Sequence, residues 1–487
     1  MNGKPRPIPK VPTRIAGLDE ILEGGFPRGR TSLACGGPGS GKTVLGLEFL
    51  CRGAIAGEPG VLVTFEERAD AVRMNARSLG WNVAALEKSG KMAIVEARLS
   101  GDEVVSGDFD IQGLLTIVGA RATKIRARRV VMDALDVLLR VYGDLERERS
   151  ELSRLHDWLI DRKLTSVLSV KTHHDGVNGR HYEFLDFMAD CVIRLDHRVQ
   201  GQVATRRLRV IKYRGSGFGT NEYPYIIGER GIVLFPLTRS ELTHKPLGAK
   251  VSSGLPGLDA MLDGGIRRAS CVLLAGSSGT GKTTLACAFA RSACHRDEKV
   301  LYLSFEESEE AMIGGMLSAG IDLRPALRTQ KLLVQTAMPE ASGSDRHLVR
   351  ALDAIDAFKP DHLILDAMSA CVRMGSEQAA FDYLMRLVAV VKDRGITCIM
   401  TNQSLVGGYD ELSGIGFSSV VDTVVQLRFV DNGHEIGRQI LVIKSRGSGH
   451  SNRREPFYIT DRGMEFPNNL RPPSARAGHA DPKEGEK

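Results

Sequence analysis

Short apolar runs of strand length alternate with segments of helical spacing along most of the chain. In the first half the strand-like runs are residues 31–35, 60–64, 130–132 and 165–170. Helical spacing of apolar positions is clear in residues 150–162. The second half repeats the order of strand-like runs, at residues 271–275, 300–304, 362–365 and 397–401. Because strands separated by helices usually pair in parallel, the pattern predicts an α/β fold, with a mainly parallel sheet flanked by helices in each half.

A glycine-rich phosphate-binding motif follows the first strand-like run of each half. Residues 36–43 read GGPGSGKT and residues 276–283 read GSSGTGKT. Two further pairs share the same separation of about 240 residues, Gly17-Leu18-Asp19 with Gly257-Leu258-Asp259 and Phe65-Glu66-Glu67 with Phe305-Glu306-Glu307. The duplicated unit is therefore a whole domain, and the sequence predicts two tandem P-loop NTPase domains.

Length and composition agree with two domains. The 487 residues, 42% of them hydrophobic, suffice for two cores. We expect an N-terminal domain over residues 1–240, a C-terminal domain over residues 241–466, and a disordered tail over residues 467–487, which has almost no large apolar residues. A linker is expected within residues 236–250.

Charge and cysteine content narrow the class of protein further. The net charge of +6 is modest, and basic residues are interspersed with acidic ones, so nucleic acid is not an expected partner. The eight cysteines include no C-x-x-C pair and are expected to be reduced. No apolar stretch reaches the length of a membrane span, and the first ten residues lack the apolar part of a secretory signal. We expect a cytoplasmic protein without membrane contact.

The glycine-rich motifs predict where ATP and Mg²⁺ bind. Their glycines let the backbone N–H groups and the following helix N-terminus face phosphate oxygens, and Lys42 and Lys282 are expected to reach the terminal phosphates. Thr43 and Thr283, with Asp133 and Asp366 after the third strand-like run of each half, are the expected Mg²⁺ ligands. The other loop positions expected to contact nucleotide are Gly36, Gly37, Gly39, Ser40, Gly41, Gly276, Gly279, Thr280 and Gly281.

Two adjacent glutamates close the second strand-like run of each half. Glu66-Glu67 and Glu306-Glu307 follow Phe65 and Phe305, where a carboxylate can orient or deprotonate a nucleophile near a bound terminal phosphate. Their identical placement favours a catalytic base over solvated surface acids. Chemistry alone leaves open which glutamate of each pair acts.

A second duplicated segment carries cations. A strand-like run ends in Lys-x-Arg-Gly-Ser in both halves, and we interpret these ends as groups that touch phosphate across a subunit boundary. The residues are Lys212, Tyr213, Arg214 and Ser216 in the first half and Lys444, Arg446 and Ser448 in the second.

Taken together, these motifs resemble the KaiC family of RecA-like ATPases and autokinases. The resemblance extends from about Pro12 to Phe466 and includes Pro339-Glu340-Ala341-Ser342. It implies two RecA-like domains, a two-tiered homohexamer with ATP between neighbouring subunits, and His450 as a further nucleotide contact. It also implies ATP hydrolysis by the N-terminal ring and serine autokinase and autophosphatase activity in the C-terminal ring.

The resemblance further implies phosphoacceptors and partners. Ser418 and Ser419, shortly before Asp422-Thr423, match the family's acceptor pair, and Ser413 matches a hydroxyl residue of its phosphate relay. A KaiB-like protein and a signalling histidine kinase are the implied partners, in clock-like or stress-related signalling. Nothing after Pro467 resembles the family's KaiA-binding segment, so we do not expect regulation by KaiA.

Three departures from the family pattern bear on these expectations. The acceptor pair is Ser-Ser rather than Ser-Thr, Ala134 and Ala367 stand where a serine is common, and the tail differs. Two alternatives stay open on the sequence. One is a RecA-like DNA-dependent ATPase, for which the Arg126 to Arg129 and Arg206 to Arg209 segments offer charge but few aromatic residues. The other is an ATPase signalling scaffold whose serines are never phosphorylated.

Overall fold

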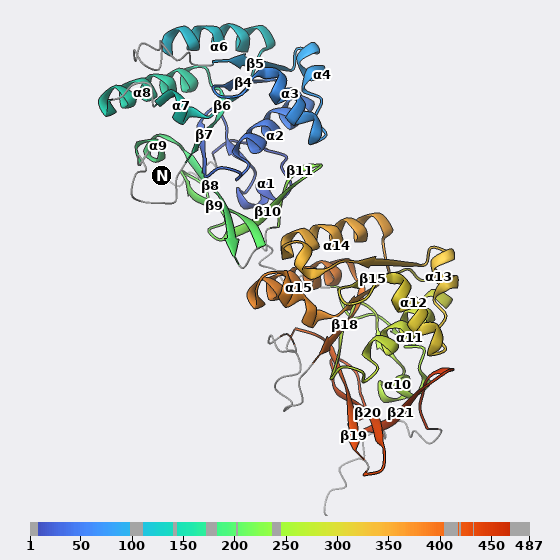
Figure 1. The fold of residues 1–487 in the computed structure, drawn as a ribbon. Helices are drawn as coiled ribbons and strands as arrows, with labels where there is room; N and C mark the ends of the chain where they lie inside the picture. Colours follow the sequence, from blue (N-terminus) through green and yellow to red (C-terminus); the bar gives the residue numbers. More distant parts are fainter. Residues whose placement is uncertain are drawn as a thin grey trace, which may run out of the picture. The chain divides into compact units, whose positions relative to one another are not determined.

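Two copies of one α/β architecture make up the protein (Figure 1). The computed structural model describes residues 8–97, 111–139, 144–171, 183–200, 203–235, 245–403, 417, 420–431 and 433–467. The chain divides between residues 240 and 241 into two compact units, apart from residues 201–203. Each unit contains a nine-stranded sheet and a small two-stranded one.

The N-terminal sheet has the order β11-β10-β9-β8-β3-β7-β6-β4-β5. Strands β3 to β8 pair in parallel, whereas β9, β10 and β11 add an antiparallel extension at one side. The bounds are β3 Thr31–Gly36, β4 Gly60–Thr64, β5 Met92–Glu96, β6 Arg129–Asp133, β7 Thr165–Lys171, β8 Cys191–Gln200, β9 Val203–Tyr213, β10 Glu222–Gly228 and β11 Gly231–Leu234. The small sheet pairs β1 (Lys10–Val11) with β2 (Phe26–Pro27).

The C-terminal sheet repeats this order as β16-β15-β17-β18-β14-β19-β20-β21-β22. Its strands are β14 Cys271–Gly276, β15 Val300–Ser304, β16 Leu332–Thr336, β17 His362–Asp366, β18 Thr397–Gln403, β19 Thr423–Asp431, β20 Ile436–Ser445, β21 Glu455–Thr460 and β22 Gly463–Glu465. The small sheet pairs β12 (Lys250–Val251) with β13 (Ile266–Arg267). All eight predicted strand-like runs are strands of the two sheets, and the predicted α/β class is confirmed.

Helices cover both faces of each sheet. The N-terminal helices are α1 Leu18–Ile21, α2 Lys42–Ile55, α3 Ala69–Ser78, α4 Val83–Lys88, α6 Ile111–Ile125, α7 Leu135–Leu139, α8 Leu145–Asp161 and α9 Glu183–Met188. The C-terminal helices are α10 Pro256–Met261, α11 Lys282–His295, α12 Glu309–Ser318, α13 Arg324–Arg328, α14 Ser344–Phe358 and α15 Glu377–Arg394, with 3-10 turns at Pro339–Ala341 and Met368–Met374. The predicted helical segment at residues 150–162 lies almost entirely in α8.

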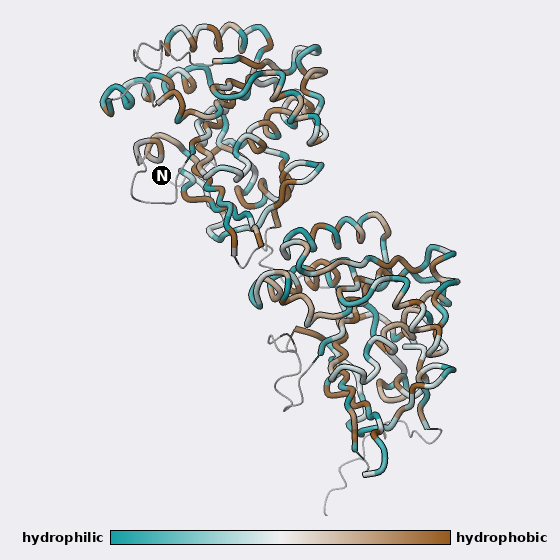
Figure 2. The backbone as a smooth tube through the Cα atoms, in the orientation of Figure 1, coloured by the Kyte–Doolittle hydropathy of each residue, from teal (hydrophilic) through white to brown (hydrophobic). Residues whose placement is uncertain are grey.

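The core of the N-terminal unit lies on the two faces of its sheet. Alternate strand residues point to opposite faces, so Leu62 of β4 packs with Phe49 of α2, while Val61 packs with α6 and α8. Figure 2 shows hydrophobic and hydrophilic positions alternating along α6 and α8, as expected for helices with one buried face. Strands buried on both faces explain why the central runs are continuously apolar.

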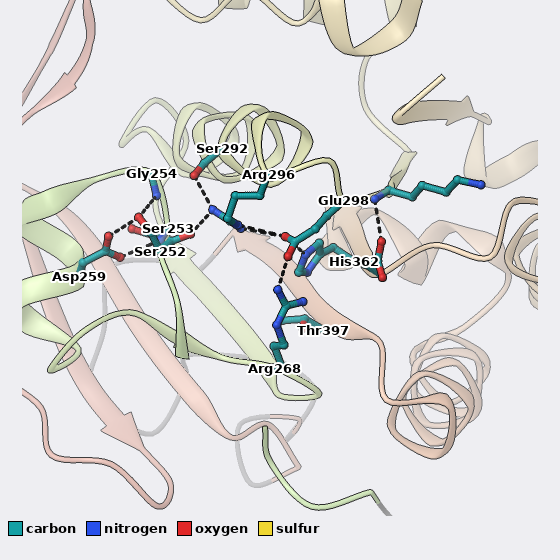
Figure 3. Close-up of polar contacts among 12 residues, drawn as sticks. Ser252, Ser253, Gly254, Asp259, Arg268, Ser292, Arg296, Glu298, His362 and Thr397 are labelled. Atoms are coloured by element: carbon teal, nitrogen blue, oxygen red, sulfur yellow. Dashed lines mark hydrogen bonds and ion pairs between the residues drawn. The ribbon is translucent and has the colours of Figure 1, made fainter. Parts of the chain in front are cut away.

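One buried position at the start of a central strand differs between the copies. In the N-terminal unit Arg129 begins β6, is 1% exposed, and donates to Glu58, to Phe49 O and to Pro12 O. In the C-terminal unit His362 begins β17, and its Nε2 lies 2.8 Å from Glu298 Oε2. Figure 3 shows Arg268 and Arg296 converging on the same Glu298 carboxylate. The guanidinium and the imidazole therefore fill equivalent places.

The helix residue beside this position changes together with it. A Cβ atom on Gly53 of α2 would lie 2.4 Å from Arg129 Nε, so the arginine requires a glycine there. The corresponding residue of α11 is Ala293, which is fully buried in the unit where the smaller His362 stands. Each copy thus has its own matched pair, Gly53 with Arg129 and Ala293 with His362.

We expect Gly53→Ala to destabilise the N-terminal unit by about 1–3 kcal/mol, because the added methyl group displaces the buried Arg129 side chain. Helix propensity alone predicts the opposite sign, a gain of about 1 kcal/mol. Urea unfolding of the full chain measures the change, with Ala293→Gly as the matched control, which should cost about 1 kcal/mol through propensity. A Gly53→Ala protein as stable as the parent would contradict the role assigned to the pair.

The C-terminal unit should also lose stability in mild acid. Burial lowers the pKa of His362, and the Glu298 carboxylate only partly opposes this effect. Below about pH 6.5 the unfolded chain therefore binds a proton here that the folded unit does not, and the free energy of unfolding falls as pH drops towards the lower folded pKa.

Urea midpoints at about pH 7.5 and about pH 5.5 test this expectation. The double variant Ala293→Gly/His362→Arg installs the non-titrating N-terminal pair and should show a smaller acid loss. Part of the loss should persist, because burial also lowers the pKa of His347. Equal pH dependence in the parent and the double variant would rule out His362 as a source.

Candidate functional site

Both glycine-rich motifs form the turn between a central strand and the helix that follows. Strand β3 ends at Gly36 and α2 begins at Lys42; β14 ends at Gly276 and α11 begins at Lys282. The residue before each helix has a left-handed backbone, with φ of 86° at Gly41 and 104° at Gly281, which only glycine adopts without strain. Helix N-termini with free N–H groups therefore face the carboxyl edge of each sheet, a suitable place for phosphate.

A lysine ammonium lies over each loop. Lys42 Nζ donates to Gly36 O at 2.7 Å and to Gly37 O at 2.9 Å. Lys282 Nζ donates to Gly276 O and Ser277 O, both at 2.9 Å. Burial lowers the pKa of both lysines, and the nearby Asp133 or Asp366 carboxylate partly opposes it. Among the described residues, the hydrogen-bond acceptors of both ammonium groups are neutral carbonyls, so an incoming phosphate offers them a stronger partner.

The residues predicted to hold Mg²⁺ lie together in both copies. Thr43 Oγ1 donates to Asp133 Oδ2 at 2.6 Å, and Thr283 Oγ1 donates to Asp366 Oδ2 at 2.9 Å. Among the described residues there is no cluster of three His, Cys, Asp or Glu that could hold a metal by itself. One hydroxyl and one carboxylate fit Mg²⁺, which keeps several waters and takes its remaining ligands from substrate phosphates.

The second oxygen of each aspartate accepts from a hydroxyl of the neighbouring strand, and Asp366 has one further donor. Ser169 donates to Asp133, and Thr401 donates to Asp366. Asp366 also accepts from Tyr302 OH at 2.6 Å, whereas Leu62 stands at the matching place in β4. These donors come from neighbouring strands and orient the carboxylates where no serine follows the aspartate, since Ala134 and Ala367 stand there.

The paired glutamates occupy equivalent tight turns but point in different directions. Glu67 N donates to Thr64 Oγ1 at 3.1 Å, and Glu307 N donates to Ser304 Oγ at 3.2 Å. In the N-terminal unit Glu66 forms an ion pair with Lys171 of β7, while Glu67 accepts from Asn75 of α3. In this unit the first glutamate is therefore directed towards β7, the neighbour of the loop's own strand, and the second towards the covering helix α3.

Glu306 is the first glutamate of the C-terminal pair. Partial burial and the nearby Asp366 carboxylate raise the pKa of Glu306, while Lys282 and Arg373 oppose the rise. The involvement of Asp366 and Lys282 places Glu306 within electrostatic reach of the loop. A carboxylate with a raised pKa at this place is a suitable proton acceptor.

Comparison with known proteins identifies the family. A family model described as the KaiC ATPase matches residues 11–239 and 251–470. The chain belongs to the KaiC family. The circadian clock protein KaiC2 of Synechocystis sp. is 38% identical to it over 464 residues, which cover 94% of this chain and 81% of KaiC2. The circadian clock oscillator protein KaiC of Synechococcus elongatus is 34% identical over 474 residues, covering 96% and 91% of the two chains. The resemblance predicted from the motifs is confirmed.

In this KaiC-family chain the Lys-x-Arg-Gly-Ser segments lie at the opposite edge of the sheet from the loops. Strand β19 runs parallel to β14, with Thr423 near Val272, and β20 is antiparallel to β19, with Ser445 opposite Thr423. Lys444 is therefore level with the start of β14, with β19 between them, whereas the phosphate loop follows the end of β14. Arg214 N donates to Asp190 O, which places the N-terminal segment at the start of β8 in the same way.

The side chains of these segments have partners within their own unit. Lys444 Nζ donates to Val421 O at 2.7 Å, Arg214 donates to Phe187 O, and Ser216 and Ser448 donate to neighbouring backbone carbonyls. Tyr213 is buried, with its OH bonded to Gly25 O at 2.7 Å. The hydroxyl of Tyr213 is thus engaged in the core, unlike the exposed Arg214 and the partly exposed Ser216 beyond it.

Two arginines beside the loops were missed by the sequence reasoning. Arg206 of β9 donates to Gly39 O at 3.1 Å, and Arg438 of β20 lies 3.4 Å from Gly279 O. They occur at the same spacing before Lys212 and Lys444, a duplication that could have revealed them.

The phosphoacceptor candidates Ser418 and Ser419, and Ser413 upstream, lie outside the described residues. The described residues around them are Phe417, which is buried, and Val420 to Thr423, which lead into β19. Asp422 accepts from Cys271 N at 2.9 Å and forms an ion pair with Lys392. His450 is partly exposed, beyond the end of β20. Among the described helices, none is long and apolar enough to cross a membrane.

Proposed function

We propose that this KaiC-family protein hydrolyses ATP at its N-terminal loop and transfers phosphate from ATP to its own serines at its C-terminal loop. The proposal places ATP with Mg²⁺ on both loops and Ser418 and Ser419 as the acceptors. It also makes the protein a homohexamer in the cytoplasm, acting in clock-like or stress-related signalling. A KaiB-like protein and a signalling histidine kinase are the proposed partners, without KaiA.

The observation that carries the proposal is the placement of the Lys-x-Arg-Gly-Ser segments. Between Arg438, beside the loop, and Lys444 the strand β20 advances by about 20 Å. Lys444 and Arg446 therefore cannot reach a nucleotide on the loop of their own unit. If they act on phosphate, as their cationic ends suggest, we assign that phosphate to a neighbouring subunit, and repetition of this contact from subunit to subunit would build the proposed ring.

In the proposed hydrolysis, Glu66 accepts a proton from a water molecule as the water oxygen bonds to the terminal phosphorus. The bond from that phosphorus to the bridging oxygen breaks, and ADP and inorganic phosphate leave. Lys42 and the loop N–H groups stabilise the charge on the phosphate oxygens. Bound Mg²⁺, held by Thr43 and Asp133, would neutralise further charge on the two end phosphates. The direction of Glu67 towards Asn75 is the reason for choosing Glu66.

The C-terminal site is proposed to replace water with a serine hydroxyl. Glu306 accepts the hydroxyl proton, the serine oxygen bonds to the terminal phosphorus, and ADP leaves. Thr283 and Asp366 would hold Mg²⁺ as in the first site. The raised pKa of Glu306 supports this role, because a base near the operating pH transfers protons most effectively.

We expect incubation of the pure protein with γ-labelled ATP to place label on Ser418 or Ser419. Glu306→Gln should reduce the labelling rate by roughly 100-fold or more, because it removes the base. Glu307→Gln is the matched control and should retain most of the labelling. ATP consumption with no label on either serine would favour the non-phosphorylating scaffold, and turnover stimulated by single-stranded DNA would favour the recombinase-like alternative.

A mixing experiment tests the proposed sharing of sites between subunits. Lys282→Ala lacks the loop lysine and Lys444→Ala lacks the distant cation, so each protein alone should label at least roughly 10-fold more slowly. In mixed rings an intact loop can meet an intact Lys444 from its neighbour, and labelling should exceed the sum of the two separate samples. If the rings are shown to exchange subunits and the mixed sample labels only as much as the two separate samples together, the shared site would be refuted.

A further inference from the structure

The two phosphate loops have different neighbours on the adjoining strand. Gly36, at the start of the N-terminal loop, pairs with Lys171 at the end of β7. Gly276, at the start of the C-terminal loop, pairs with Gln403 at the end of β18. Neighbouring strands lie about 4.8 Å apart, so each of these residues is immediately beside its loop.

Lys171 joins the N-terminal loop to the first glutamate. Its Nζ lies 2.5 and 2.7 Å from the two carboxylate oxygens of Glu66, and its backbone N–H donates to Asp136 Oδ1 at 3.0 Å. Burial is the main cause of the lowered pKa of Lys42, and the charge of Lys171 adds to the effect. The Lys171 ammonium thus contacts the proposed base and lies within electrostatic reach of the loop lysine, with 31% of its side chain exposed.

The C-terminal unit has neither charge of this arrangement. Gln403 replaces the lysine, and its backbone N–H points at Ser369 Oγ, the counterpart of Asp136. Within the part of the chain that the structure describes, Glu306 has no hydrogen bond or ion pair. The two units therefore differ at two charged positions: the N-terminal loop has a buried carboxylate and an ammonium beside it, and the C-terminal loop has neither.

A bound nucleotide changes the balance of attraction on Lys171. The terminal phosphate of a triphosphate carries more negative charge than the single Glu66 carboxylate and lies beside the loop that Lys171 borders. A diphosphate on the same loop leaves that place without the extra charge. The lysine therefore has a competing partner only when a triphosphate is bound.

We propose that Lys171 is a positioning residue that exchanges Glu66 for the terminal phosphate of a nucleoside triphosphate bound at the N-terminal loop. The exchange frees the Glu66 carboxylate for water only while there is a phosphate to be transferred. With a diphosphate the ion pair re-forms. This inference rests on the proposed nucleotide site, and it assigns discrimination between triphosphate and diphosphate to a residue that the C-terminal copy lacks.

Nucleotide titration of the full chain tests the proposal. A parent carrying Lys282→Ala reports only the N-terminal site, and the ligands are ADP and the non-hydrolysable β,γ-imido analogue of ATP, each with Mg²⁺. Lys171→Gln, which installs the C-terminal residue, should weaken binding of the triphosphate analogue about tenfold, the worth of one charge-assisted contact, and leave ADP binding unchanged. Lys171→Arg, which keeps the charge, should retain most of the preference.

A second variant separates an exchange of partners from a structural role. Glu66→Gln removes the competing carboxylate, so triphosphate affinity should rise when Lys171 is present and stay constant in the Lys171→Gln background. Equal losses for both nucleotides, or an unchanged preference in Lys171→Gln, would overturn the inference while leaving the proposed function intact. Lys42→Ala should abolish the binding of both nucleotides. If the parent itself binds neither nucleotide, both the proposed function and this inference are wrong.

Discussion

Parallel pairing of the central strands is the constraint on which both sites depend. Because β3, β7, β6 and β4 all end at one edge, their last residues bring together a glycine loop, a lysine, an aspartate and a glutamate pair from positions up to about 135 residues apart. No local sequence preference could collect Gly36, Glu66, Asp133 and Lys171. The sheet does so through register alone, and the second copy repeats the arrangement with Gly276, Glu306, Asp366 and Gln403.

The antiparallel extension of each sheet serves a different purpose. It crosses from the loop edge to the far edge, so its first residues, such as Arg438, lie by the unit's own loop and its last, such as Lys444, lie far from it. One strand therefore has two distinct ends, which makes a repeating contact between identical subunits possible without any change in fold. This polarity supports the proposed ring.

Much of the fold could be predicted from the sequence, because buried parallel strands are continuously apolar and phosphate loops have a nearly unique composition. The loop residues and the Thr43–Asp133 neighbourhood followed from motif spacing. The direction of Glu66 and Glu67 did not, since it depends on Lys171, which is distant in sequence, and on Asn75 in the next helix, which belongs to no motif. The arginines at 206 and 438 share one spacing before Lys212 and Lys444, but their contact with the loops could not be predicted, because their partners are backbone carbonyls.

The pairing of Gly53 with Arg129, and of Ala293 with His362, has a consequence for the gene. Duplicated segments invite recombination, and a crossover falling between the helix and the strand would join an alanine helix to an arginine strand. Such a chimaera would place a methyl group against a buried guanidinium, a steric penalty of about 1–3 kcal/mol in a domain of marginal stability. Packing of this kind makes the exchange of sequence between the two halves unfavourable, and so helps the halves to evolve separately.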